Sequence, residues 1–214
     1  MAVKAKICGL MRPEDAGRAA DAGARYLGVV FARGPRAVTP EGAAELVTAG
    51  GGVPVMGVFA EQTADTILQI CEQAGLSGAQ LHGRYTSSDA ERLQAAGLLV
   101  WRVVRIAAPA DLDAVAAARF ASDAVLVEPR SPAALGGTGI ALGLDLARAA
   151  RERLGSHPLV LAGGLTPETV AEAIAKIRPE IVDVSSGVEL RPGIKDHTKI
   201  ARFVEAVFAH SSIA

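Results

Sequence analysis

Short apolar runs rich in Val, Ile and Leu alternate along the chain with longer amphipathic stretches. Such runs are typical of strands buried on both faces, and the stretches between them have the spacing of helices with one apolar face. The pattern predicts eight strands, at residues Val3–Cys8, Tyr26–Phe31, Val53–Phe59, Gly78–His82, Leu98–Ile106, Ala124–Glu128, Leu159–Ala162 and Ile181–Ser185. A predicted helix follows each strand, so the chain reads as a series of β/α units.

Capping residues mark where several of these helices begin and end. Arg12-Pro13-Glu14-Asp15 opens the first helix, with a proline near its start and acidic residues in its first turn. Thr39 and Thr166 each precede a Pro-Glu pair and are expected N-caps. The remaining expected caps are Thr63, Ser87 or Ser88, and Asp196 at N-termini, and Gly23, Gly75 and Gly97 at C-termini.

The last two predicted strands end in glycine and serine. Gly163 and Gly164 follow the seventh strand, and Ser185, Ser186 and Gly187 lie at the end of the eighth. Such ends expose backbone N–H groups and hydroxyls, which suit an anion and most often a phosphate. A phosphate site after the last two strands is typical of (β/α)8 barrels. We therefore predict an α/β fold, a single (β/α)8 TIM barrel of eight parallel strands forming one domain over residues 1–214.

An open doubly wound sheet is the alternative fold for alternating strands and helices. That fold usually places its phosphate loop after an early strand. The chain contains neither a G-x-G-x-x-G nor a Walker pattern. The late position of the glycine-rich ends therefore favours the barrel.

Composition narrows the classes of function. The net charge of −1, from 22 basic and 23 acidic residues, lacks the basic bias of a nucleic-acid-binding protein. The N-terminus does not resemble a signal peptide, and no apolar stretch has the length of a membrane span. Two cysteines in separate contexts indicate neither a disulfide framework nor a zinc site. We expect a reduced, cytoplasmic protein that binds a small molecule, without nucleic acid, membrane or metal.

The carboxyl ends of the predicted strands carry a thiol, a carboxylate and a nearby arginine, and barrels gather their reacting groups at these ends. Cys8 ends the first strand, Glu128 ends the sixth, and Arg36 follows the second. A thiol and a carboxylate across the barrel mouth suit proton transfer, and a guanidinium suits bidentate binding of a carboxylate. The alternatives are a buried apolar role for Cys8 and a solvated loop position for Arg36. Cys71 lies within a predicted helix and is expected in the core.

The surroundings of Cys8 bear on its reactivity. A cationic neighbourhood would lower the pKa of its thiol from the ordinary value of about 8.5 toward neutrality. Lys6 lies two residues before Cys8, so both side chains point to the same face of the strand. Because the last strand is the neighbour of the first in a closed barrel, we predict an ion pair between Lys6 and Asp183. In the alternative, Lys6 bends toward solvent.

Two further features lie near the predicted mouth. His82 shares a strand face with Gln80 and is interpreted as a hydrogen-bonded, non-catalytic histidine. Gly136-Gly137-Thr138-Gly139 follows the sixth strand, where a glycine-rich loop could close over the mouth as a lid.

An ordered series of segments covering nearly the whole chain resembles phosphoribosylanthranilate isomerase of tryptophan biosynthesis. Each segment alone is a weak signal, but their order along the chain is specific. The matching segments are Lys6-Ile7-Cys8-Gly9, Leu27-Gly28-Val29-Val30-Phe31, Gly57-Val58-Phe59, Gln80-Leu81-His82-Gly83, Gly136-Gly137-Thr138-Gly139, Leu161-Ala162-Gly163-Gly164-Leu165, Asp183–Glu189 and Pro192-Gly193-Ile194-Lys195-Asp196.

The resemblance implies an Amadori rearrangement of N-(5-phosphoribosyl)anthranilate to 1-(2-carboxyphenylamino)-1-deoxyribulose 5-phosphate. In that family a carboxylic acid opens the ribose ring and a cysteine thiolate removes the proton from C2. Carried over, Glu128 is the general acid, Cys8 is the general base, and Arg36 binds the anthranilate carboxylate. The phosphate would be held by Gly163, Gly164, Ser185, Ser186 and Gly187. No cofactor is implied, because the protonated imine is itself the electron sink.

The chain departs from the family pattern in three places. Glu128 stands where the family usually has aspartate and reaches about 1.5 Å farther. Gly34 replaces a common serine, and Ile140-Ala141-Leu142-Gly143-Leu144-Asp145 replaces a Phe-Asp pair after the glycine-rich loop. Asp145 is a poor substitute acid, because it should lie inside the next helix.

Two alternative functions remain open. A phosphosugar-binding barrel that has lost catalysis would explain the altered acid, although the retained Cys8 and Arg36 argue against it. A related aldose–ketose isomerisation in histidine biosynthesis would usually employ two aspartates, so the thiol of Cys8 argues against that reading. The sequence leaves the oligomeric state open between a monomer and a homodimer.

Overall fold

Eight parallel strands form a closed barrel in the computed structural model, which describes residues 2–130 and 143–211. Each strand pairs with the next along the chain, and β8 closes the barrel against β1. The strands are β1 (Lys4–Ile7), β2 (Tyr26–Val30), β3 (Val55–Phe59), β4 (Gly78–Leu81), β5 (Leu99–Ile106), β6 (Ala124–Pro129), β7 (Leu159–Leu161) and β8 (Ile181–Val184). The predicted fold class is confirmed.

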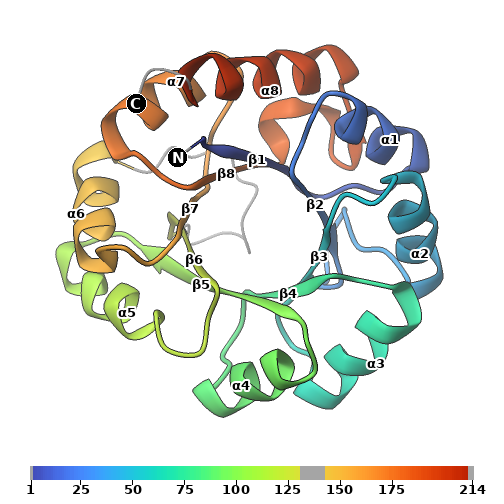
Figure 1. The fold of residues 1–214 in the computed structure, drawn as a ribbon, viewed down its shortest axis with the longest axis horizontal. Helices are drawn as coiled ribbons and strands as arrows, with labels where there is room; N and C mark the ends of the chain where they lie inside the picture. The colour runs from blue at the N-terminus through green and yellow to red at the C-terminus, as the bar shows by residue number, and fades with distance from the viewer. Residues whose placement is uncertain (1, 131–142, 212–214) are drawn as a thin grey trace.

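The helices form an outer ring around the strands, with α8 lying between α7 and α1 (Figure 1). They are α1 (Pro13–Asp21), α2 (Pro40–Ala49), α3 (Ala64–Ala74), α4 (Ser87–Ala95), α5 (Leu112–Ala117), α6 (Leu144–Leu154), α7 (Val170–Ile177) and α8 (His197–Ser211). Two short 3₁₀ turns, η1 (Pro109–Asp111) and η2 (Ser186–Val188), complete the helical elements. No helix formed by the described residues is long and apolar enough to cross a membrane.

Side-chain caps fix the starts of several helices. The predicted N-caps that accept a backbone N–H are Thr39, Thr63 and Asp196. The prediction of Ser87 or Ser88 as a cap is wrong, because Thr86 makes a reciprocal capping box with Asp89. Thr166 is also not the N-cap, since α7 begins only at Val170.

Apolar side chains pack both outside and inside the barrel. The larger cluster lies between the strands and the helices and includes Leu27, Leu81 and Phe203. A smaller cluster includes Met56, Trp101, Leu126 and Val160, with Leu126 opposite Val160 in the β6–β7 register. Side chains alternate along a strand, so Leu126 and Glu128 share one face of β6. The apolar layer therefore lies directly beneath the polar groups at the carboxyl end.

An antiparallel hairpin follows η2 and was not predicted. Its strands, β9 (Glu189–Arg191) and β10 (Ile194–Lys195), are only three and two residues long. Gly193, in the turn between them, has a φ of +81°, a left-handed conformation that glycine adopts without strain. The hairpin returns the chain to the barrel mouth before α8 and brings Glu189 and Lys195 back toward the site.

Candidate active site

The residues singled out at the strand ends come together at one end of the barrel. Glu128, the glycines after β7 and the Ser185–Gly187 segment line a common cavity. Asp183 also lines this cavity, and its carboxyl is influenced by the charge of Glu128. The same carboxyl influences the Cys8 thiol, so Asp183 lies within electrostatic range of both. The structure thus gathers a thiol, a carboxylate and a glycine- and serine-rich turn at the barrel mouth.

Cys8 is buried at the carboxyl end of β1. Burial raises the pKa of its thiol, while Lys6 and Lys195 act in the opposite direction. Lys6 lies beside the thiol as expected, but the expectation that a cationic neighbourhood lowers this pKa toward neutrality is wrong, because burial and the charge of Asp183 outweigh the two lysines. Cys71 lies in the core of α3 as predicted, and burial raises its pKa to about 12.

The predicted ion pair between Lys6 and Asp183 is confirmed. The two residues are direct partners in the β1–β8 register, with Lys6 Nζ 3.1 Å from Asp183 Oδ1. Lys6 Nζ also donates to Gln80 Oε1 at 2.8 Å and lies 5.6 Å from the centre of the Trp101 ring. Burial acts to lower the pKa of Lys6, but Asp183 and Cys8 together hold it above its ordinary value.

Glu128 and His82 form a buried contact that sequence reasoning missed. Glu128 Oε1 lies 2.7 Å from His82 Nε2, and both side chains are almost fully buried. His82 does have a hydrogen-bond partner, as interpreted from the sequence, but that partner is the candidate acid itself. A histidine and a glutamate at the ends of strands two apart in the barrel are the signal that could have revealed the pair.

Arg36 is held by a carboxylate of its own chain. Its Nε donates to Glu189 Oε1 at 2.8 Å and its Nη2 donates to Oε2 at 2.7 Å. Lys195 Nζ donates to the same Oε1 at 2.9 Å and to the Ser185 carbonyl at 3.0 Å. Burial acts to raise the pKa of Glu189, but Arg36 and Lys195 hold it below its ordinary value. Glu189 and Lys195 were not predicted as part of the site.

Backbone geometry at the ends of β7 and β8 favours an anion. Gly163 and Gly164 have φ values of +97° and +69°, so two successive residues take conformations that glycine favours. A Cβ on Gly163 would collide with the Pro129 ring, and one on Gly187 would collide with the Leu165 carbonyl. After β8, the first N–H groups of η2 lack acceptors within their own turn. Turns of this kind expose backbone N–H groups that suit an anion.

The profile of the N-(5'phosphoribosyl)anthranilate (PRA) isomerase family matches residues 5–206. The chain belongs to this family. An N-(5'-phosphoribosyl)anthranilate isomerase of Trichlorobacter lovleyi is 39% identical over 204 residues, which are 94% of this chain and 96% of that protein. The crystal structure of the Thermotoga maritima phosphoribosyl anthranilate isomerase has a TM-score of 0.86 at 33% identity, covering 96% of this chain and 98% of that one.

A further solved structure in the PRA isomerase family contains a bound ligand. It is a phosphoribosyl anthranilate isomerase in complex with reduced 1-(o-carboxyphenylamino)-1-deoxyribulose 5-phosphate. Its TM-score is 0.83 at 31% identity, with 96% of this chain and 98% of that chain covered. Membership of this family makes the chain an isomerase of the tryptophan pathway and agrees with the resemblance seen in its motifs.

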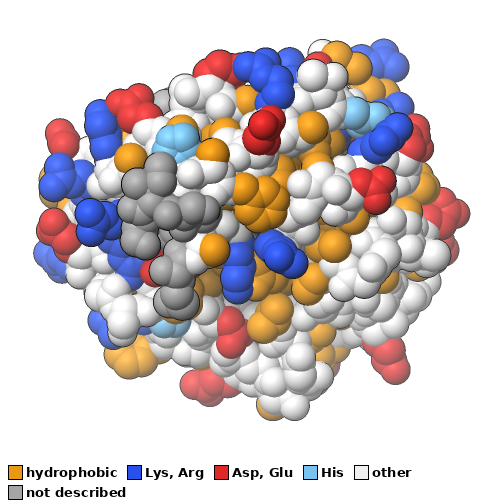
Figure 2. Space-filling model, turned by 45° about the horizontal axis from the view of Figure 1, so that its top comes forward, with side chains coloured by type: hydrophobic (Ala, Val, Ile, Leu, Met, Phe, Trp, Pro, Cys, Tyr) orange, Lys and Arg blue, Asp and Glu red, His pale blue; other side chains and the backbone are white. Residues whose placement is uncertain are grey.

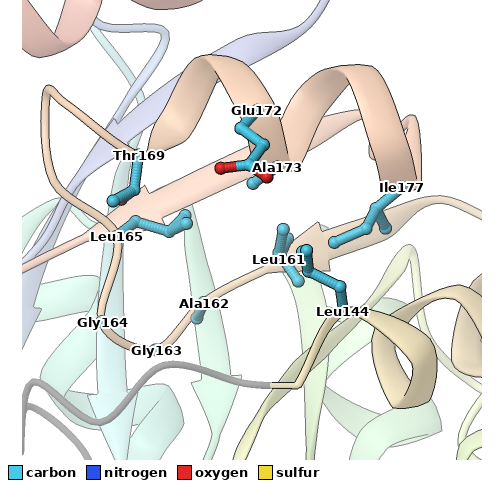
Figure 3. A pocket seen from close by; sticks show the side chains of 10 residues that line it. All are labelled: Leu144, Leu161, Ala162, Gly163, Gly164, Leu165, Thr169, Glu172, Ala173 and Ile177. Atoms are coloured by element: carbon cyan, nitrogen blue, oxygen red, sulfur yellow. The ribbon is translucent and has the colours of Figure 1, made fainter.

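A second hollow lies next to the turn of Gly163 and Gly164 that follows β7. Its walls are mostly apolar and come from β7, α7 and the start of α6 (Figure 3). Gly163 and Gly164 line both hollows, so their turn separates the polar mouth from this apolar groove.

The charged side chains on one face of this family member are mixed in sign (Figure 2). Basic and acidic side chains are interspersed on the face drawn in Figure 2, with apolar side chains among them. Among the described residues, no three His, Cys, Asp or Glu are grouped in a way that could hold a metal. Asp145 lies in the first turn of α6, as predicted. The glycine-rich segment 136–139, predicted as a lid, lies outside the described residues.

Proposed function

We propose that the chain converts N-(5'-phosphoribosyl)anthranilate to 1-(2-carboxyphenylamino)-1-deoxyribulose 5-phosphate by an Amadori rearrangement. The observation that carries the proposal is the meeting of a buried thiol, a buried carboxyl group and an anion-binding turn around Asp183. These are the groups that such a reaction requires: a base, an acid and a holder for the phosphate. The ligand of the related crystal structure has the same phosphosugar and carboxyphenylamino parts.

Glu128 acts as the general acid in the first step. Its carboxyl proton passes to the ring oxygen of the ribose, the C1–O bond breaks, and the nitrogen lone pair forms the protonated imine. The burial of Glu128 keeps water from competing for this proton. His82 Nε2, 2.7 Å from the carboxyl, holds it in place.

Cys8 acts as the general base in the second step. Its thiolate takes the proton from C2, the C2–H electrons form a C1–C2 double bond, and the imine nitrogen accepts the displaced pair. The enolamine then gains a proton at C1 and loses its C2 hydroxyl proton, which yields the ketone. Lys6 and Lys195 favour the thiolate against the cost of burial.

Contacts at two ends of the substrate would orient it. Arg36 binds the anthranilate carboxylate. The phosphate is held by backbone N–H groups and hydroxyls from Gly163, Gly164, Ser185, Ser186 and Gly187. Binding at both ends places the ribose between Cys8 and Glu128, and such orientation supplies much of the rate enhancement in reactions of this kind.

Turnover of the substrate is the test that separates this proposal from a barrel that only binds phosphosugars. Freshly made N-(5'-phosphoribosyl)anthranilate is mixed with the protein, and the loss of its anthranilate-type fluorescence is followed. Rapid loss supports the isomerase. Tight binding of the reduced product analogue without any loss of fluorescence would instead establish a lapsed enzyme.

A further inference from the structure

We propose that Glu189 is a positioning residue that sets selectivity for the substrate carboxylate by fixing the guanidinium of Arg36. The inference rests on the proposed function, in which Arg36 receives that carboxylate. Arg36 and Glu189 are 153 residues apart in sequence, yet two hydrogen bonds of 2.8 and 2.7 Å join them in a fork. Glu189 touches Arg36 rather than any reacting atom, so its effect would pass through the guanidinium.

The two hydrogen bonds to Glu189 use the N–H donors on one edge of the Arg36 guanidinium and leave the donors on another edge for a ligand. A guanidinium has five N–H donors in a single plane. Glu189 takes the Nε donor and one Nη2 donor. Among the described residues, Arg36 makes no other hydrogen bond that the structure records. The remaining Nη1 and Nη2 donors form a second fork, which matches the two oxygens of a carboxylate.

Glu189 is itself held rigidly. Its Oε1 accepts from Lys195 Nζ at 2.9 Å and from the Gly193 N–H at 3.3 Å, in addition to Arg36. The side chain of Glu189 is 5% exposed and that of Lys195 is fully buried, whereas Arg36 retains 16% exposure. The arginine alone therefore reaches the accessible part of the site. The hairpin formed by β9 and β10 creates this anchor.

The charges of the cluster also fit one carboxylate. Arg36 and Lys195 contribute two positive charges and Glu189 contributes one negative charge, which leaves one positive charge in a mostly buried place. With Cys8 in its neutral thiol form, one substrate carboxylate neutralises this charge. The neighbouring pair of Lys6 and Asp183 is neutral by itself and leaves this balance unchanged. A ligand without a carboxylate would leave the exposed edge of Arg36 unpaired, which costs binding energy.

The test compares two probes. One is reduced 1-(2-carboxyphenylamino)-1-deoxyribulose 5-phosphate, and the other is the same molecule without its carboxyl group. The quantity measured is the dissociation constant of the probe without the carboxyl group divided by that of the probe with it. A general loss of stability would affect both constants alike and leave this ratio unchanged. In Glu189→Gln the ratio should fall by about tenfold or more, because a charge-assisted hydrogen bond no longer orients Arg36. The matched control, Glu41→Gln on the surface of α2, should keep the wild-type ratio.

A double-mutant cycle decides whether Glu189 acts through Arg36. In an Arg36→Met background, Glu189→Gln should change the ratio little further. An unchanged or increased ratio in Glu189→Gln alone, or an equal loss in both backgrounds, would overturn the proposal. If Glu189→Gln does not fold, Glu189→Asp serves in its place. Its carboxylate falls short by about 1.5 Å, so the ratio should again fall. A wild-type protein that does not distinguish the probes would refute the binding role of Arg36 in the proposed function instead.

Discussion

His82 and Glu128 join the ends of β4 and β6 through a buried hydrogen bond, with Nε2 and Oε1 2.7 Å apart. The two strands both pair with β5, so the bond crosses over the end of that strand. A neutral imidazole offers one N–H and one acceptor nitrogen. The bond can therefore persist whether the proton lies on the carboxyl or on the ring. His82 thus gives the glutamate carboxyl a fixed partner across the mouth.

Variants at these two positions should be coupled. Glu128→Gln should nearly abolish turnover because an amide cannot act as the acid. Glu128→Asp should retain a substantial part of the turnover but withdraw the carboxyl by about 1.5 Å from His82. His82→Asn should then lower kcat by about tenfold or more in the wild-type background and much less in Glu128→Asp. Steady-state kinetics on wild type, Glu128→Asp, His82→Asn and the double variant of the last two measure the coupling. Equal losses in both backgrounds would show that His82 acts independently of Glu128.

The pKa of Cys8 predicts an alkaline pH dependence. Since the thiolate is the base and burial raises the pKa of the thiol, kcat/KM should still rise with pH above about 8.5, the ordinary pKa of a cysteine.

Stability should change in the opposite direction. The Cys8 contribution is present below the unfolded-state pKa and is lost as pH rises through the folded-state pKa, because the unfolded chain then releases its proton first. Urea unfolding at increasing pH checks this, and Cys8→Ala should lose stability less steeply than wild type. If Cys8→Ala loses stability with pH as steeply as wild type, another group causes the loss. The variant Cys71→Ala controls for the other buried thiol.

Breaking the buried pair beneath the site should cost far more than breaking a surface pair. Lys6→Met leaves the Asp183 carboxylate without its partner and should lower the free energy of unfolding by about 3–5 kcal/mol. Adding Asp183→Asn should restore part of this loss. Lys176→Met, which breaks the exposed pair with Glu172 on α7, should change stability far less. Additive losses in the Lys6 and Asp183 variants would contradict the pairing.

Gly28 on β2 should prove necessary for the geometry of Cys8. A Cβ at this position would stand 2.7 Å from Cys8 Sγ and 3.0 Å from Lys6 Cε. Gly28→Ala should therefore displace the thiol and lower kcat by about a hundredfold, the typical cost of a 1 Å misplacement. Gly17→Ala in α1 is the matched control. Its Cβ would meet only the Ala49 carbonyl at 3.6 Å, so activity should be unchanged and stability slightly higher. Full activity in Gly28→Ala would show that Cys8 tolerates displacement.

Much of the fold could be predicted because the β/α alternation is strong. All eight barrel strands fall within two residues of their predicted bounds, and strand periodicity together with barrel closure predicted the Lys6–Asp183 pair. The glycine- and serine-rich strand ends also lie together on one cavity, as their late position in the chain indicated. Each of these inferences depended on local pattern or on a neighbour relationship that the topology dictates.

The remainder depended on side-chain directions and on very short elements. The Arg36–Glu189 fork requires a hairpin whose strands are too short to show a periodicity. The His82–Glu128 bond joins strands that do not pair, so no register predicts it. The pKa of Cys8 was misjudged because the neighbouring cation Lys6 could be foreseen more readily than the extent of burial.

The most direct test of the account is a single-turnover measurement on the two groups assigned to proton transfer. Binding of the substrate is first confirmed for wild type, Cys8→Ala and Glu128→Gln. Each protein, in excess over the substrate, is then mixed with freshly made N-(5'-phosphoribosyl)anthranilate, and the loss of fluorescence is followed. We predict rapid loss in wild type and a rate at least about a hundredfold lower in each variant, which is the lower end of the range for removing a general acid or base. A variant that binds the substrate and converts it at the wild-type rate would contradict the assignment of that residue.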